Sequence, residues 1–366
     1  MVIFSILANV NIIRRQIEIN TKTKYTSIED ILGPSISHEE ALQLISSDAE
    51  INEDFCRLQP NQRDNILSFI QGKNGLAITY NNVFQHIFNP DIHPERIESL
   101  LSALLDSPVK YKKTLSREGS MLIENGSHLV MDVIVENDLG ETYNIEMQKI
   151  GHMFPGERSS CYVSDAIMRQ YLAKKAEHKD HFRYVQMKPV YLIVLMEESS
   201  FPLKQVSPEY IHKQINSYSS GAEITSLEHV CYFSLDTFEE RVHNVDSRMH
   251  AWLTFLSATS PERILELVNN YPDFIEFYKE VAMFRQDYKE LIKMSLAMLA
   301  ETDYYDYINE LKERREDAKK YEAQIEQMQE ANDALQADKD ALQAQLQEKA
   351  EIIAKYEALL AEQKNK

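Results

Sequence analysis

Residues 129–149 read Leu129-Val-Met-Asp-Val-Ile-Val-Glu-Asn-Asp-Leu-Gly-Glu-Thr-Tyr-Asn-Ile-Glu-Met-Gln-Lys149, two apolar-rich runs joined by a turn. The triplet Asp138-Leu-Gly140 predicts a three-residue hairpin loop, because glycine can take the left-handed conformation that such a loop needs. With the turn centred near Leu139, Asp132 and Glu146 each lie seven residues away (139 − 132 and 146 − 139) and project side by side from one face. A bulge in either strand would shift this pairing by one residue.

The two facing carboxylates indicate a metal site. Asp132 and Glu146 both interrupt runs that a sheet would bury, and burying two uncompensated negative charges is costly. Mg²⁺ (or Mn²⁺) suits such a pair, because a hard cation is commonly held by one or two carboxylates with water and phosphate. Bound there, the cation could activate water and stabilise the charge of a phosphodiester transition state.

Gln148 adds a third polar group to this face. It shares the side of Glu146 by strand alternation, where it could orient water or hydrogen-bond a phosphate. Spacing alone leaves structural alternatives open, because carboxylates in adjacent strands also serve as edge-strand charges or as ordinary hydrogen-bond acceptors.

The elements around the hairpin predict an α/β fold. Apolar or alternating runs at 119–124, 128–136 and 142–149 precede a helical pattern at 156–175, and residues 190–196 form a continuous apolar run. Such a run is typical of a strand buried on both faces, and this order of elements is an α/β order. Further helices are expected at 38–47, 59–71, 80–88 and 94–106, and the chain reads as mainly helical after Pro202.

These patterns divide the chain into four expected segments. They are a variable N-terminal segment (1–58), the core (59–200), a mainly helical region (201–313) and a coiled coil (314–363).

The C-terminal segment differs from the rest in composition. From about Arg314 it contains no glycine or proline and is rich in Ala, Gln, Glu, Leu and Lys. One heptad register places apolar or aromatic residues at nine of twelve core positions, which are Ile325, Asn332, Lys339, Leu346, Ile353 and Leu360 at a, and Tyr321, Met328, Leu335, Leu342, Lys349 and Tyr356 at d. The 3.5-residue period predicts a coiled coil, and Asn332 at a favours a dimer. A single helix laid on the globular body is the alternative.

The net charge of the chain limits which part of its surface could bind nucleic acid. Its formal charge of −19 argues against a surface broadly adapted to DNA. Residues 149–188 nevertheless hold eight Lys or Arg and four acids, a local balance of +4 (8 − 4). This segment is the candidate for phosphate contact, and a solvated helix face is the alternative.

Localisation is predicted from what the sequence lacks. It contains no run of 18 apolar residues, so no membrane span is expected. The three cysteines, Cys56, Cys161 and Cys231, have neither zinc nor redox spacing and are interpreted as reduced thiols, mostly buried, of a cytoplasmic protein.

Several of these pieces together resemble the PD-(D/E)XK nuclease family transposases, also called recombination-promoting nucleases, of bacteria. The resemblance covers roughly residues 60–310, and no single piece is specific by itself. The matching pieces are Asp132, Ile145-Glu-Met-Gln148, Phe154-Pro-Gly-Glu-Arg158, Arg158-Ser-Ser-Cys-Tyr162, Arg169-Gln-Tyr171, Val190-Tyr-Leu-Ile-Val194 and the 78–88 helix.

The resemblance implies a restriction-endonuclease-like core, a small mixed sheet flanked by helices. It implies that Asp132, Glu146 and the Met147 carbonyl hold the metal, with Gln148 as a further catalytic group, and that water attacks DNA in a homodimer. DNA contact is expected from the basic helix, through Arg158, Arg169, Lys174 and Lys175.

This sequence departs from the family pattern at two positions of the first helix. Asn81 stands where the family has Asp, and Gln85 where it has Lys. Asn81 removes one possible metal-side carboxylate. Gln148 replaces the Lys of the general motif, but Gln is usual in this family.

Three hypotheses follow. The first is a metal-dependent DNA endonuclease of transposase-like or mobile-element type, dimerised through residues 314–363. The second is a catalytically inactive relative that binds DNA or a protein, which Asn81 favours. The third is a coiled-coil scaffold with a passive globular head, which would bind no divalent metal.

Overall fold

The computed structural model describes residues 24–117, 132–150, 155–206, 208–300 and most of 314–350. The chain divides into two compact units, residues 1–301 and 302–366, which are described separately. The strand predicted at 119–124 lies outside the described residues. Within them, no helix is both long enough and apolar enough to cross a membrane.

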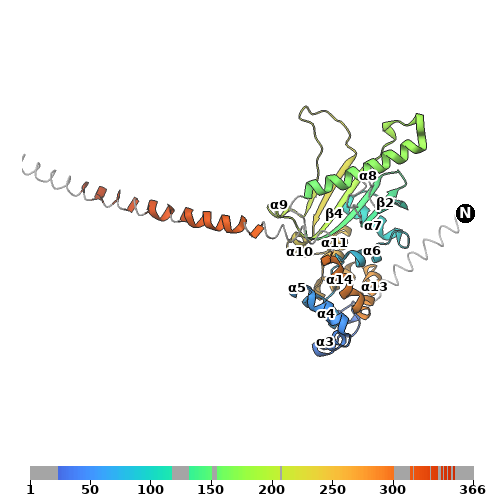
Figure 1. Ribbon diagram of the computed structural model, residues 1–366, viewed down its shortest axis with the longest axis horizontal. Coiled ribbons are helices and arrows are strands. Elements are labelled where there is room, and N and C mark those ends of the chain that lie inside the picture. The colour runs from blue at the N-terminus through green and yellow to red at the C-terminus, as the bar shows by residue number, and fades with distance from the viewer. Residues whose placement is uncertain are drawn as a thin grey trace, which may run out of the picture. The chain divides into compact units, whose positions relative to one another are not determined.

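A mixed sheet of six strands forms the centre of the first unit (Figure 1). Its order is β1-β2-β3-β4-β6-β5, with β3, β4 and β6 parallel to one another and the other pairs antiparallel. The strands are β1 (Tyr111–Thr114), β2 (Val133–Asn137), β3 (Thr142–Ile150), β4 (Val190–Glu198), β5 (Ile211–Lys213) and β6 (Glu228–Ser234).

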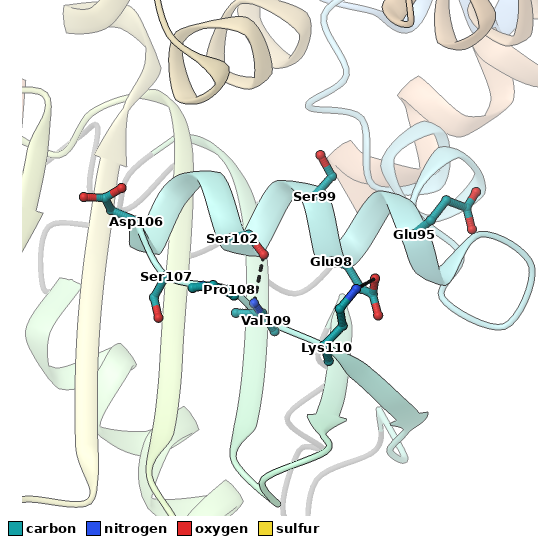
Figure 2. Close-up of a pocket in the computed structure, with 9 residues that line it drawn as sticks. All are labelled: Glu95, Glu98, Ser99, Ser102, Asp106, Ser107, Pro108, Val109 and Lys110. Atoms are coloured by element: carbon teal, nitrogen blue, oxygen red, sulfur yellow. Dashed lines mark hydrogen bonds and ion pairs between the residues drawn. The ribbon is translucent and has the colours of Figure 1, made fainter. Parts of the chain in front are cut away.

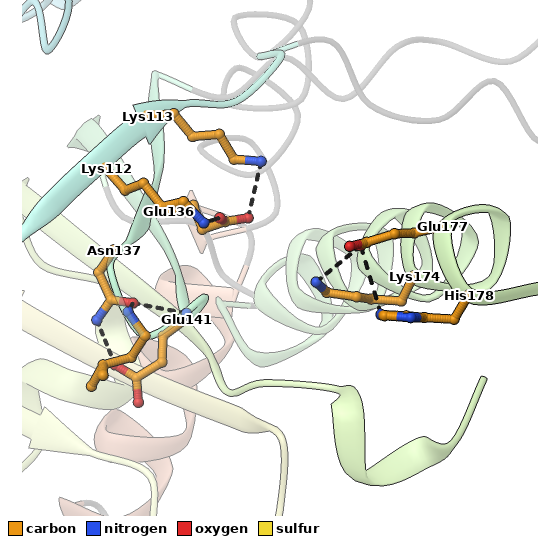
Figure 3. A network of polar contacts seen from close by, with 9 residues as sticks. Lys112, Lys113, Glu136, Asn137, Glu141, Lys174, Glu177 and His178 are labelled. Carbon is orange, nitrogen blue, oxygen red and sulfur yellow. Dashed lines mark hydrogen bonds and ion pairs between the residues drawn. The ribbon is translucent and has the colours of Figure 1, made fainter. Parts of the chain in front are cut away.

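The β2–β3 hairpin has the register that its turn predicts. Val133 pairs with Ile145 and Ile134 with Asn144, so no bulge shifts the strands. Asn137 closes the turn, because its Oδ1 accepts hydrogen bonds from the backbone N–H groups of Leu139 and Glu141 at 3.0 and 2.9 Å (Figure 3). Gly140 takes the left-handed conformation, with φ of 81°.

Both faces of the sheet are covered by helices. On one face, Val190, Leu192, Val194 and Met196 of β4 pack with Tyr162, Val163 and Ala166 of α8 (Pro155–His178). On the other face, Ile193 and Leu195 join the large core made with the remaining helices. The expected burial of β4 on both faces is therefore confirmed.

The remaining helices of this unit, apart from α9, surround the second face and build the body beside it, whereas α9 packs through Leu203 on the α8 side (Figure 1). They are α2 (Glu29–Leu32), α3 (His38–Ser46), α4 (Ala49–Arg57), α5 (Pro60–Gln71), α6 (Asn81–Ile87), α7 (Pro94–Leu105), α9 (Phe201–Lys204), α10 (Leu235–Arg241), α11 (Arg248–Ser257), α12 (Pro261–Asn270), α13 (Phe274–Gln286) and α14 (Tyr288–Ala300). Two 3₁₀ turns, η1 (Lys179–His181) and η2 (Tyr184–Gln186), follow α8.

Helix ends follow the local chemistry. Ser37 forms a capping box with Glu40 at the start of α3. Gly72, with φ of 75°, ends α5. The helices expected at 38–47, 59–71, 80–88, 94–106 and 156–175 are therefore all confirmed, within a few residues at their ends.

Two details differ from expectation. The region after Pro202 is mainly helical as predicted, but it also contributes β5 and β6 to the central sheet, and β6 lies directly beside β4. The sheet therefore continues past the boundary expected at residue 200. Of the cysteines, Cys231 is buried, whereas Cys56 and Cys161 are exposed.

The second unit is helical at its described positions between 314 and 350. Its apolar heptad residues are exposed in the single chain, Leu335 at 70% and Leu342 at 60%. An isolated helix gives these side chains nothing to pack on, and the coiled coil stays a prediction.

Candidate active site

Asp132 and Glu146 meet at the start of the β2–β3 hairpin. Extending the observed register by one position past the Val133–Ile145 pair places Asp132 beside Glu146. Both side chains are nearly withdrawn from solvent, at 8% and 4% exposure. Glu146 pairs in register with Val194, whose side chain packs toward α8, so the carboxylates lie on the face that α8 covers.

Each carboxylate is held by a hydrogen bond to the hairpin. The Met147 backbone N–H donates to Asp132 Oδ2 at 2.7 Å. The Asn144 side-chain amide donates to Glu146 Oε1 at 2.9 Å. These contacts fix the orientation of both acids before any ligand binds.

Burial and mutual repulsion set the charge state of the pair. Burial raises the pKa of Glu146 well above its usual value, and the charge of Asp132 raises it further. Hydrogen bonds from Asn144 and the Asp132 backbone, and the positive charge of Arg158, oppose this shift without cancelling it. A divalent cation bound by the acids would offset both causes of the raised pKa, because it brings positive charge to the buried pair.

The donor set suits a hard cation of the magnesium class. Among the described residues, no group of three or more His, Cys, Asp and Glu side chains could hold a metal ion. Two buried carboxylates remain, and Mg²⁺ is commonly bound by one or two carboxylates, with waters and substrate phosphates completing its shell. The residues present therefore fit such an ion only if water or substrate supplies further ligands.

Asn144 is a site residue that the sequence interpretation missed. Its side chain is 1% exposed and its amide contacts Glu146. Its Oδ1 is buried and has no hydrogen-bond partner among the described residues. The available signal was strand alternation, since a residue two positions before Glu146 must share its face.

Met147 and Gln148, the other predicted site residues of β3, lie on opposite faces of the sheet. Met147 is 4% exposed and packs in the core opposite α8, so its backbone, rather than its side chain, is near the acids. Gln148 is half-buried and follows Glu146 on the α8 side by alternation. The side chains of Asn81 and Lys149 lie outside the described residues.

Arg158 brings a positive charge to this site from the first turn of α8. Its Nη2 donates to the Tyr162 hydroxyl at 3.0 Å, and its guanidinium lies over that ring at 5.2 Å. Its charge lowers the pKa of Glu146, which places it within electrostatic reach of the acids. A phosphate at the carboxylates would therefore lie near the Arg158 charge, and Arg117, whose Nη1 donates to the Asp132 backbone carbonyl at 3.5 Å, is a second arginine beside the acids.

The three other predicted DNA contacts on α8 have partners within the protein. Arg169 pairs through Nε with Asp165 at 2.9 Å and donates from Nη1 to the Ser116 carbonyl at 2.6 Å, which ties α8 to the chain after β1. Lys174 pairs with Glu177 at 3.3 Å (Figure 3), and Lys175 donates to the Tyr171 hydroxyl at 3.1 Å.

A separate hollow lies along α7 and the turn that follows it (Figure 2). Its walls come from residues 95–110, and none of the carboxylate pair belongs to it. Within it, Ser102 accepts a hydrogen bond from the Val109 N–H, and Lys110 pairs with Glu98. These contacts connect α7 to β1, so we assign the hollow no chemistry.

Comparison with known protein families identifies a match over much of the chain. A family model described as PD-(D/E)XK nuclease family transposase matches residues 80–311, more than half of the 366-residue chain. No curated protein and no solved structure matches the chain significantly. The matched range contains the carboxylate pair, α8 and all six strands.

Proposed function

Because the chain belongs to the PD-(D/E)XK nuclease family transposases, we propose that it is a metal-dependent DNA endonuclease that hydrolyses phosphodiester bonds. One observation carries this proposal: Asp132 and Glu146 are buried side by side on one face of the β2–β3 hairpin. Two buried acids in contact are unfavourable unless a cation compensates them. Asp132, Glu146 and the Met147 carbonyl are the proposed ligands.

When bound, a Mg²⁺ or Mn²⁺ ion would supply an activated water and stabilise the developing charge of the phosphate. The residues of the chain prepare that chemistry. Asn144 and the Met147 N–H hold the two carboxylates in fixed orientations. Gln148, on the same face, orients the attacking water or donates to a phosphate oxygen.

Arg158 and the basic side chains of α8 are the proposed DNA contacts. Arg158, whose charge reaches Glu146, neutralises the phosphate to be cut. We propose that Lys174 and Lys175 neutralise phosphates farther along the strand. We propose that Arg169 serves this surface indirectly, because both of its contacts hold α8 in place.

A second candidate function is a catalytically inactive DNA- or protein-binding module. Asn81, at the first position of α6, favours it, since the family has a carboxylate there. Retention of Asp132, Glu146 and Gln148 together argues for the enzyme. Binding of DNA without metal-dependent cleavage would support the inactive module.

We further propose that residues 314–363 make the protein a homodimer. The described tail is helical, and its leucines at d positions are exposed in one chain. A second copy of the same helix would bury them in register. Two active sites in one dimer would allow both DNA strands to be cut.

The test is incubation of supercoiled plasmid with the full-length protein in Mg²⁺, in Mn²⁺ and in EDTA. We expect metal-dependent nicking or linearisation that Asp132→Ala abolishes. The matched control is Asp138→Ala, which removes an exposed carboxylate from the same hairpin. Equal activity of wild type and Asp132→Ala would identify a contaminating nuclease and contradict the proposed active site.

A further inference from the structure

Three aromatic side chains gather where α8 ends and the 3₁₀ turns begin. Tyr171 and Tyr184 are stacked with centroids 6.3 Å apart and an interplanar angle of 12°. Phe182 meets Tyr171 and Tyr184 edge-on, at 5.4 Å from each. We call these three rings the aromatic platform. It faces solvent rather than the core, since Tyr184 is 76% exposed and its neighbour Val185 81%.

The surroundings of the platform are positively charged. Residues 171–188 contain five Lys or Arg and two acids, a balance of +3 (5 − 2) in a chain of −19. Lys175 lies over the Tyr171 ring, with Nζ 5.4 Å from its centroid. Within the described residues, Lys179 and Arg183 have no ion-pair partner, and both are exposed. Their charges are therefore available to an anionic partner.

We propose that the aromatic platform binds an unpaired stretch of the DNA strand, with a base stacked on Tyr184 and phosphates on the surrounding cations. This inference rests on the proposed nuclease function and names the substrate form. Bases in a duplex are already stacked on one another. An exposed aromatic ring can therefore stack on a base only where the strand is unpaired. Exposed aromatics with Lys and Arg are the combination by which proteins hold single strands without reading sequence. A neutral apolar partner would gain nothing from the charges of Lys175, Lys179 and Arg183.

Helix α8 sets the spacing between this platform and the cutting site. Arg158 and Tyr171 are thirteen residues apart (171 − 158), which at the helical rise is about 20 Å. A nucleic-acid strand advances about 3.4 Å per nucleotide in a duplex. The open stretch is therefore expected about six nucleotides from the phosphate that is cut, so the preferred substrate is a duplex with a single-stranded tail or flap.

The first test measures binding of the full-length protein in EDTA, so that cleavage plays no part. The probes are a fluorescein-labelled short duplex and the same duplex with a single-stranded thymidine tail, compared by anisotropy. We expect Tyr184→Ala to weaken binding of the tailed probe about 10-fold and to leave the plain duplex unchanged within about 2-fold. The matched control is Tyr218→Ala, a half-exposed tyrosine at 49% outside the platform. Equal loss on both probes, or no loss, would overturn the proposal.

A second test reads stacking directly. The chain has one tryptophan, Trp252, which is fully buried, so Tyr184→Trp adds a solvent-exposed fluorophore to the platform. We expect saturable quenching of its emission by oligothymidylate and little by plain duplex. Absence of quenching, or a change in self-association instead of DNA binding, would overturn the platform. Failure of the nuclease proposal looks different: tailed DNA binds through Tyr184 while plasmid remains uncut.

Discussion

The Asp132 carboxylate accepts a hydrogen bond from the backbone N–H of Met147 at 2.7 Å, so a side chain at the start of β2 is tied to the main chain of β3. The bond holds the Asp132 carboxylate beside Met147, which directly follows Glu146 in β3. The two carboxylates are therefore held in place by the hairpin itself, which is the preorganisation that the proposed metal site would need.

Asp132→Asn should remove metal binding while leaving the fold intact. The amide oxygen of asparagine can still accept from Met147, but it lacks the negative charge that a hard cation needs. We expect Mn²⁺ affinity, measured by titration calorimetry, to fall by at least about 100-fold, since even indirect contacts to a metal typically contribute 10- to 100-fold. Asp138→Asn should bind like wild type. Unchanged Mn²⁺ binding by Asp132→Asn would place the metal elsewhere.

Glu146→Gln should make the metal-free protein more stable at neutral pH. The pKa of Glu146 is raised by its burial and by the charge of Asp132. The substitution removes the ionisable group on which both effects act. Relief of such functional strain commonly stabilises by about 0.5–2 kcal/mol. Urea denaturation in EDTA measures the gain, and added Mg²⁺ should stabilise wild type but not the variant. A destabilised Glu146→Gln in EDTA would mean that the charge is already compensated within the protein.

Substitutions of Arg169 and Lys175 in α8 should distinguish a structural role from a DNA-binding role. Arg169→Gln loses the contacts to Asp165 and to the Ser116 carbonyl, so we expect unfolding to require about 1–2 kcal/mol less. Lys175→Gln should leave stability unchanged and reduce the slope of log affinity against log salt by about 1. Chemical denaturation measures the stability of each variant, and DNA titration over a salt series measures its phosphate contacts. A loss of stability in Lys175→Gln with a reduced salt slope in Arg169→Gln would mean that Lys175 is the structural residue and Arg169 the DNA contact.

The hairpin was predictable because its information is local. Gly140 marks the turn, and counting from Leu139 gives the register that pairs the strands on either side. Neither step depends on distant residues. The pairing of the two acids follows from it, whereas their role as metal ligands stays a prediction.

The missed elements depend on tertiary contacts. Tyr111–Thr114 forms β1 at an edge of the sheet with two exposed lysines and no buried side chain, so it lacks an apolar pattern. The strand β6 reads Glu-His-Val-Cys-Tyr-Phe-Ser, and its position follows from parallel pairing with β4, more than thirty residues earlier (228 − 190). No local pattern in the sequence specifies which strand a segment joins.

The Arg96–Glu280 pair should stabilise the helical body in a pH-dependent way. Arg96, 6% exposed, donates to Glu280 at 2.8 Å and so joins α7 to α13. Its hydrogen bond lowers the pKa of Glu280. The stabilisation is therefore present above the ordinary glutamate pKa of 4.5 and is lost as pH falls through the lowered value.

Glu280→Gln should cost about 1.5–3 kcal/mol at pH 7, because it removes a hydrogen-bonded charge from a buried arginine. The difference from wild type should shrink in acid. Denaturation at a series of pH values measures this, with Glu276→Gln, on an exposed site of the same helix, as the control. A pH-independent difference would show that the loss is one of packing alone.

The tail should make the protein a dimer through its d-position leucines. Leu335→Lys combined with Leu342→Lys places charges where four leucines of two chains would meet, and burial of each leucine contributes about 1.5–3 kcal/mol. We expect the dissociation constant to rise at least about 1000-fold, so that light scattering of the full-length variant gives the 42.5 kDa of one chain instead of twice that mass. Ala334→Lys with Gln347→Lys adds the same charge outside the heptad core and should remain dimeric. A wild-type protein of monomeric mass, or a control that dissociates equally, would show that the leucines do not form the dimer interface.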